Sequence, residues 1–182
     1  MKPIIKAVAD EISFVLSNVN EEEAVTLSKN LRTAKRIFIC GEGRSGLMGK
    51  AFAMRLMHGG YHVYVIGETI TPSIEADDLF IAISGSGSTG TILQLALKAK
   101  EVGANVFLVT TNRDSKIASV SDGVLVIPAA TKYRRSNEPK TIQPLGNQFD
   151  QAVHLLLDAV IISSLQVDAT YEKMHHRHTN LE

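Results

Sequence analysis

The feature that most constrains the fold of this chain is an apolar run that ends in closely spaced glycines. Residues 37–39 are such a run, as expected of a buried strand. Gly41, Gly43 and Gly46 come next, and apolar side chains at helical spacing follow them. Glycines let the backbone turn tightly and approach a ligand closely, while the N–H groups and positive end of the next helix favour an anion. The pattern predicts a strand, a glycine turn and a helix N-terminus suited to phosphate.

Strand-like and helix-like segments alternate along the rest of the chain. Two amphipathic helices precede residue 35, and they either cover the sheet or pair with another subunit. The alternation that follows predicts right-handed crossovers and a parallel sheet. We therefore expect an α/β fold, a three-layer α/β/α sandwich of the flavodoxin-like or Rossmann-like type, with a five-stranded parallel sheet and ligands at the carboxyl ends of its strands. The expected strands are residues 36–40, 61–66, 79–84, 105–110 and 123–127, and the expected helices after the first strand are residues 45–58, 89–102, 115–121 and 149–165.

The 182 residues suit one domain with a substantial core. The expected helix 149–165 is apolar nearly all round, which favours packing on the sheet on one side and on another subunit on the other. The parts of the domain are expected to be N-terminal helices (1–34), an α/β core (35–128), a loop and C-terminal helix (129–168), and a polar tail (169–182).

Charge and cysteine content exclude several classes of protein. Lysine plus arginine and aspartate plus glutamate both number 19, so a nucleic-acid partner is not expected. Cys40, the single cysteine, excludes an internal disulfide and fits a reducing compartment. At the end of a buried strand, Cys40 is expected to be a packed apolar side chain rather than a nucleophile. No segment resembles a signal peptide or membrane span, so we expect a cytoplasmic protein with no membrane partner.

The first glycine turn, taken alone, fits two classes of ligand. Its G-x-G-x-x-G spacing matches the dinucleotide fingerprint, and Glu68 follows where a ribose-binding carboxylate is expected, which predicts a dinucleotide-dependent oxidoreductase. A second turn, residues 84–89 (S-G-S-G-S-T), also joins a strand to a helix. Its N–H groups and hydroxyls suit one phosphate dianion, although Ser88 or Thr89 is equally suited to a plain helix N-cap. Because a nicotinamide enzyme has no obvious use for this second turn, the pair of turns favours a phosphorylated small molecule.

Together the two turns resemble those of the sugar isomerase (SIS) family of phosphosugar-binding domains. That family pairs a G-x-G-x-S turn with a later S-x-S-G-x-T loop, and residues 41–45 and 84–89 match them. The resemblance is greatest to the hexulose-phosphate isomerases of the family and covers essentially the whole chain. The matching strings are G-R-S-G-L-M (43–48), F-A-M-R-L-M-H (52–58), V-I-G-E (65–68) with Thr71-Pro72, I-S-G-S-G (83–87), K-T-I-Q-P-L-G (140–146) and a tail ending in H-x-N-L-E.

The resemblance implies an isomerase that interconverts 3-hexulose 6-phosphate and fructose 6-phosphate through an enediol, the second step of formaldehyde fixation in the ribulose monophosphate pathway. It also implies no metal or organic cofactor and a homotetramer with active sites near subunit contacts. Moving a carbonyl from C3 to C2 needs a group that removes the neighbouring proton and returns it to the next carbon. Binding energy from the remote phosphate holds the sugar in register. The alternative is a phosphosugar-sensing module that binds without turnover.

The resemblance also assigns residues to roles. The base falls on Asp150, where the family usually carries glutamate, and the shorter side chain leaves His58 as the other candidate for proton transfer; His58 is otherwise expected to open the sugar ring or protonate an oxygen. Arg44 is expected to stabilise enediolate charge or contact phosphate, and Glu68 to shape the pocket. Ser88 stands where the family's loop commonly has glutamate. The residues expected to bind phosphate are Gly43, Ser45, Ser84, Gly85, Ser86, Gly87, Ser88 and Thr89.

Position alone offers simpler roles for two of these residues. Asp150 is a first-turn acid that the helix dipole favours, and His58 is a cation at a helix C-terminus. The histidines of the tail, His175, His176 and His178, form either a surface cluster or part of a tail that folds over a neighbouring site, and their spacing does not favour a metal.

Overall fold

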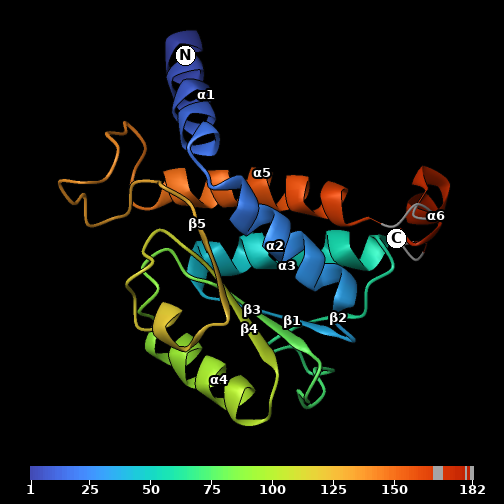
Figure 1. The fold of residues 1–182 in the computed structure, drawn as a ribbon. Helices are drawn as coiled ribbons and strands as arrows, with labels where there is room; N and C mark the ends of the chain where they lie inside the picture. The colour runs from blue at the N-terminus through green and yellow to red at the C-terminus, as the bar shows by residue number, and fades with distance from the viewer. Residues whose placement is uncertain (166–169, 179, 181–182) are drawn as a thin grey trace.

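A computed structural model describes residues 1–165, 170–178 and 180 of the chain. The boundary predicted between the C-terminal helix and the tail, and much of the H-x-N-L-E ending, lie outside the described residues. The sheet has five strands in the order β2-β1-β3-β4-β5, all of them parallel (Figure 1). The predicted five-stranded parallel α/β fold is therefore confirmed. The strands are β1 (Ile37–Gly41), β2 (Val63–Val65), β3 (Leu79–Ile83), β4 (Asn105–Thr110) and β5 (Gly123–Val126).

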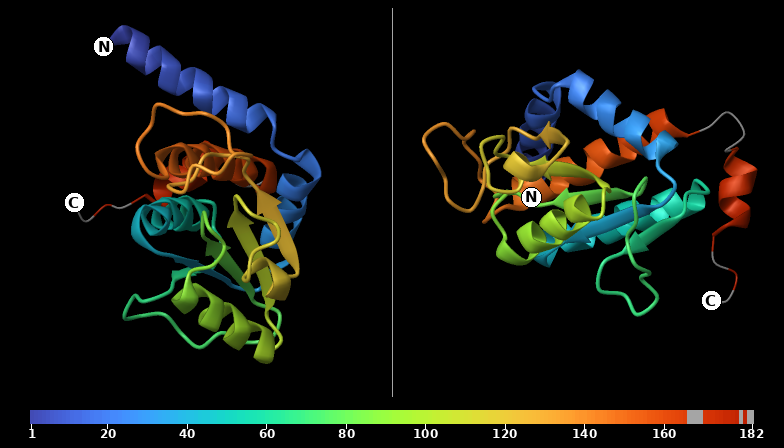
Figure 2. Two further views of the ribbon diagram at one scale, coloured as in Figure 1. Left: turned by 90° about the vertical axis from the view of Figure 1, so that its left-hand side faces the viewer. Right: turned by 60° about the horizontal axis from the view of Figure 1, so that its bottom comes forward.

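Helices cover both faces of this sheet. On one face lie α2, α3 and α5, and on the other lies α4 with the short 3-10 helix η1 (Figures 1 and 2). The C-terminal end of α1 lies near α5, and the N-terminal part of α1 projects away from the body (Figure 2). None of the helices in the described part of the chain is both long and apolar enough to cross a membrane. The helices are α1 (Lys2–Ser17), α2 (Glu21–Thr33), α3 (Gly43–His58), α4 (Gly90–Glu101), η1 (Ala118–Val120), α5 (Asn147–Ser164) and α6 (Tyr171–His176).

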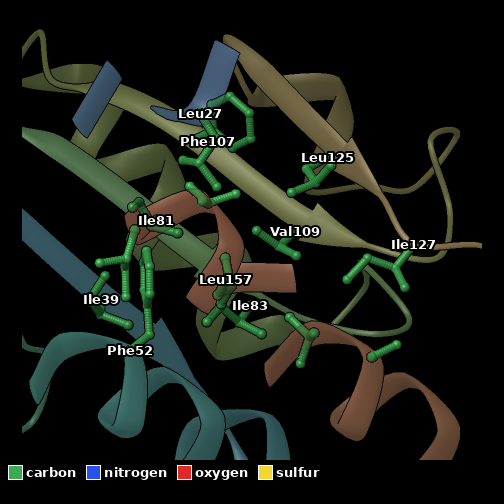
Figure 3. Close-up of a cluster of buried hydrophobic side chains, with 14 of the residues drawn as sticks. Leu27, Ile39, Phe52, Ile81, Ile83, Phe107, Val109, Leu125, Ile127 and Leu157 are labelled. Atoms are coloured by element: carbon green, nitrogen blue, oxygen red, sulfur yellow. The ribbon is translucent and has the colours of Figure 1, made fainter. Parts of the chain in front are cut away.

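Alternation along the strands divides the interior into two cores. Ile39 and Ile81 point into the core beneath α3 and α5 together with Leu157 (Figure 3), whereas Phe38 and Phe80 point to the α4 side. This follows from the two-residue period of a strand, in which successive side chains lie on opposite faces. Because both faces of the sheet are covered, each strand is a nearly continuous run of apolar residues. These runs allowed the strands to be predicted from the sequence.

Three predicted elements differ from the structure. The second strand was predicted over residues 61–66 but pairs only over β2, because the Tyr61 N–H closes α3 on the Leu56 carbonyl and the Tyr61 hydroxyl donates to the Ser164 carbonyl. The expected helix 115–121 is only the three-residue η1, since the Ser115 side chain packs against Gly87 of the β3–α4 turn. No helix was named in the polar tail, which contains α6; its N-cap Thr170 accepts a hydrogen bond from the Lys173 N–H.

Candidate active site

The site begins where β1 ends and α3 begins. A Cβ on Gly46 would lie 2.6 Å from the Gly41 carbonyl oxygen, so only glycine lets the first turn of α3 approach the end of the strand this closely. Gly43 has a φ of 55°, the left-handed conformation that glycine adopts without strain. These two glycines place the N–H groups of α3 at the carboxyl edge of the sheet, where an anion is favoured.

The second turn, between β3 and α4, is held from within. Ser84 is buried, and its Oγ accepts a hydrogen bond from the Gly87 N–H at 3.2 Å and lies 3.2 Å from Thr89 Oγ1. The Thr110 and Thr111 hydroxyls both donate to the Gly85 carbonyl, at 3.2 and 2.8 Å. These internal hydrogen bonds define the shape of the turn, and α4 begins directly after it.

Ser86, which is half-buried, and Ser88, which is exposed, form the more accessible part of the same turn. The Ser88 N–H donates to Ser86 Oγ, and the Ser88 hydroxyl donates to the Ser86 carbonyl, both at 3.3 Å. These side chains are accessible to a ligand, in contrast to Ser84, whose hydroxyl shapes the turn.

The two turns meet at the switch point of the sheet. β1 and β3 are neighbours with Gly41 opposite Ile83, so both turns leave the same edge side by side. The Thr91 hydroxyl in α4 donates to the Glu42 carboxylate in the first turn and ties the two together. Sequence reasoning missed Glu42, whose only signal was a charge inside the glycine pattern. It also missed Thr110 and Thr111, although hydroxyls at the end of a parallel strand belong to this edge.

Asp150 is brought to these turns by α5. Its carboxylate is buried in the first turn of that helix, and it accepts from Arg44 Nε at 3.0 Å and from Ser45 Oγ at 3.2 Å. Arg44 Nη2 also donates to the Asn147 side-chain oxygen. The side chain of Arg44 is 59% exposed, so its guanidinium faces the outside of the site while it pairs with a buried acid. Three predicted residues, Asp150, Arg44 and Ser45, are thus in contact, and Asn147 is a partner that sequence reasoning missed.

Glu68 lies after β2 at the same edge of the sheet. Its carboxylate is exposed and pairs with Lys50 Nζ of α3 at 2.9 Å. Its side-chain partner is Lys50 rather than a member of the Asp150 cluster, and its role in shaping a pocket stays a prediction.

His58 is at the other end of α3 from Asp150. The helix has 16 residues and is therefore about 24 Å long. His58 is buried, its ring stacks on His178 with centroids 5.2 Å apart, and its carbonyl accepts from Arg177 Nη1 at 3.1 Å. Burial, with smaller contributions from Arg55 and His178, lowers the pKa of His58 from its ordinary value. Within one chain, His58 does not join the other predicted site residues.

The two remaining predictions concern Cys40 and the histidines of the tail. Cys40 is buried, and burial with a contribution from Glu42 raises the pKa of its thiol to about 11, as expected of a packed side chain rather than a nucleophile. His175 and His176 lie in α6, and the described residues contain no group of three or more histidine, cysteine, aspartate or glutamate side chains placed to hold a metal. The groups gathered at the site are a carboxylate, a guanidinium, and hydroxyl and N–H donors.

Comparison with known proteins shows which proteins this chain is similar to. A family model described as the SIS domain matches residues 30–142. The 3-hexulose-6-phosphate isomerase of Bacillus subtilis is 37% identical over 179 residues, covering 98% of this chain and 97% of that protein. The enzyme of the same name from Mycobacterium gastri is 38% identical, covering 98% of this chain and 89% of that protein. A crystal structure from Methanococcus jannaschii, for which a function of 3-hexulose-6-phosphate isomerase was inferred, has a TM-score of 0.85 at 33% identity and covers 98% of both chains.

Proposed function

The chain belongs to the SIS domain family, and on this basis we propose that it is a 6-phospho-3-hexuloisomerase, a sugar-phosphate isomerase that converts 3-hexulose 6-phosphate to fructose 6-phosphate. The observation that carries the proposal is the buried Asp150 carboxylate beside Arg44 and Ser45, at the edge where two phosphate-type turns meet. In the ribulose monophosphate pathway, this reaction is the second step of formaldehyde fixation.

The proposed mechanism uses the substrate phosphate as an anchor. The 84–89 turn and the N-terminus of α4 bind the phosphate, with hydroxyls and N–H groups as donors. Gly43 and Ser45 contribute donors from the first turn. The phosphate is remote from C2 and C3, so its binding energy holds those carbons against the carboxylate.

Proton transfer is assigned to Asp150. Its carboxylate takes the proton from C2 of the 3-ketose, giving a 2,3-enediolate with the negative charge on O3. The hydroxyl proton of O2 then passes to O3, and Asp150 returns its proton to C3 as the carbonyl forms at C2. The Arg44 guanidinium stabilises the negative charge on the enediolate oxygen. Its exposure and its contact with Asp150 support this role, because the same group faces both the base and the solvent side of the site.

We further propose a cytoplasmic homotetramer in which His58 acts in a neighbouring subunit's site, since it lies at the far end of α3 in its own chain. There the imidazole opens the sugar ring or protonates an oxygen. An apolar groove of about 810 Å³ between α1 and α5 supports contact with a second copy.

A coupled assay tests the reaction and its base. Ribulose 5-phosphate, formaldehyde and hexulose-phosphate synthase supply the substrate, with a chelator present, and fructose 6-phosphate is read through glucose-6-phosphate isomerase and dehydrogenase. We expect Asp150→Asn to lower kcat by about a hundredfold to ten-thousandfold, because an amide cannot accept the proton. Asp158→Asn, an exposed change in the same helix, is the matched control and should retain wild-type turnover.

The variants separate the alternatives. Activity that survives in Asp150→Asn but is lost in His58→Ala would move the proton transfer to His58. A wild-type protein that binds fructose 6-phosphate without turnover would instead be a phosphosugar-sensing module.

A further inference from the structure

Glu11 of α1 lies at the centre of a hydrogen-bond cluster outside the proposed site. Its Oε1 accepts from the Ile142 N–H at 2.8 Å, and its Oε2 accepts from Gln143 Nε2 at 2.9 Å. Oε2 also accepts from the Thr141 hydroxyl and, at 3.4 Å, from Gln148 Nε2. One carboxylate therefore ties the projecting helix α1 to the segment that leads into α5.

The cluster continues through two amides and the Arg44 guanidinium to Asp150, the proposed base. Gln143 is buried, and its Oε1 accepts from Asn147 Nδ2 at 2.7 Å. The Asn147 side-chain oxygen accepts from Arg44 Nη2, and Arg44 Nε donates to Asp150 at 3.0 Å. An unbroken series of hydrogen bonds thus runs from Glu11 through Gln143, Asn147 and Arg44 to Asp150.

The charge on Glu11 determines the direction of this series. An ionised carboxylate can only accept hydrogen bonds, so the Gln143 NH2 group must face it. The Gln143 oxygen is then left for the NH2 group of Asn147, whose oxygen in turn faces the guanidinium. Burial raises the pKa of Glu11, but the hydrogen bonds from the surrounding donors outweigh it and hold that pKa below its ordinary value.

We propose that Glu11 is a positioning residue: through Gln143 and Asn147 it sets where the Arg44 guanidinium stands against Asp150. The catalytic consequence rests on the proposed isomerase function, whereas the structural consequence, the placement of Arg44, does not. A small displacement of a group that contacts reacting atoms is costly to the rate, since the productive geometry is narrow.

Glu11→Gln tests the proposal in the full-length protein. The amide has one oxygen where the carboxylate had two, so at least one surrounding donor loses its acceptor, and the Gln143 NH2 group loses the charged acceptor that fixes its orientation. We expect kcat for 3-hexulose 6-phosphate to fall roughly tenfold to a hundredfold, with a smaller change in KM. We also expect the 15N–1H resonance of Arg44 Nε, assigned by its loss in Arg44→Lys, to move. Asp10→Asn in the same helix, which breaks only the exposed pair with Lys6, should leave kcat and the resonance unchanged.

A second variant tests the proposal while Glu11 still holds α1 to the segment that leads into α5. Gln143→Leu removes both amide contacts but leaves Glu11 its hydrogen bonds to Thr141, Ile142 and Gln148, and it should reproduce the effects of Glu11→Gln. If Glu11→Gln does not fold, Gln143→Leu decides the matter.

Two results would overturn the proposal: wild-type kcat with an unmoved Arg44 resonance in either folded variant, or an equal loss in Asp10→Asn. If the wild type has no isomerase activity, the proposed function fails. The Arg44 resonance then decides alone, since movement in Glu11→Gln upholds the positioning role and an unmoved signal overturns it.

Discussion

At the residue scale, Gly87 shows how one missing side chain permits the phosphate-type turn. Its φ is 62°, and a Cβ there would lie 2.1 Å from Ser115 Oγ and 3.0 Å from Thr110 Oγ1. We expect Gly87→Ala to lower the free energy of unfolding by about 2–4 kcal/mol, through strain and a clash that opens the turn. Gly90→Ala is the matched control: its Cβ meets no atom of the described residues within 4 Å, so stability should hold or rise by up to about 1 kcal/mol. Urea denaturation measures both, and equal losses would refute the steric explanation.

At the scale of elements, α6 packs on the end of α3, where protonation of His58 would place a positive charge beside other cationic groups. His58 stacks on His178 and lies near Arg55, while Arg177 donates to its carbonyl. Because the pKa of His58 is lowered in the folded protein, the unfolded chain binds the proton first, at about pH 6.5. Stability from this group is therefore complete above that pH and is lost as the pH falls below it. We expect the free energy of unfolding to fall between about pH 7.5 and about pH 5.5, and to fall less in His58→Phe. Urea denaturation at a series of pH values measures this, and an equal change of the free energy of unfolding with pH in both proteins would contradict the prediction.

At the scale of the whole molecule, α1 projects from the body (Figure 2), and several of its apolar side chains, among them Ile4, Ile5 and Phe14, are exposed. Ile5, 59% exposed, lines the groove between α1 and α5 together with Leu16 and Leu155. If a second copy covers this surface, a buried charge there is costly, and we expect Ile5→Asp to shift the proposed tetramer to smaller species. Ile70→Asp, at an 81% exposed isoleucine after β2, is the control and should leave the mass unchanged. Light scattering measures both, and a wild-type mass for Ile5→Asp would exclude this surface as the interface.

Local patterns were sufficient to predict the architecture. Apolar runs predicted the strands because both faces of the sheet are covered, and the glycines at 41, 43 and 46 predicted the first turn because only glycine permits its close approach. The same reasoning placed Asp150 in the first turn of a helix and Ser84 in a turn. These features depend on neighbours in the chain, which periodicity and spacing report directly.

Contacts between distant parts of the chain were decided only by the tertiary structure. Arg44 and Asp150 are 106 residues apart, and their pairing depends on how α5 lies against α3. The series that begins at Glu11, the placement of His58 beneath α6 and the short pairing of β2 likewise depend on packing between elements. The sequence by itself determined the sheet, the turns and the residue types of a phosphosugar site. Which side chains meet was decided by the three-dimensional fold, because hydrogen bonds form between groups adjacent in space and spacing along the chain does not specify that adjacency.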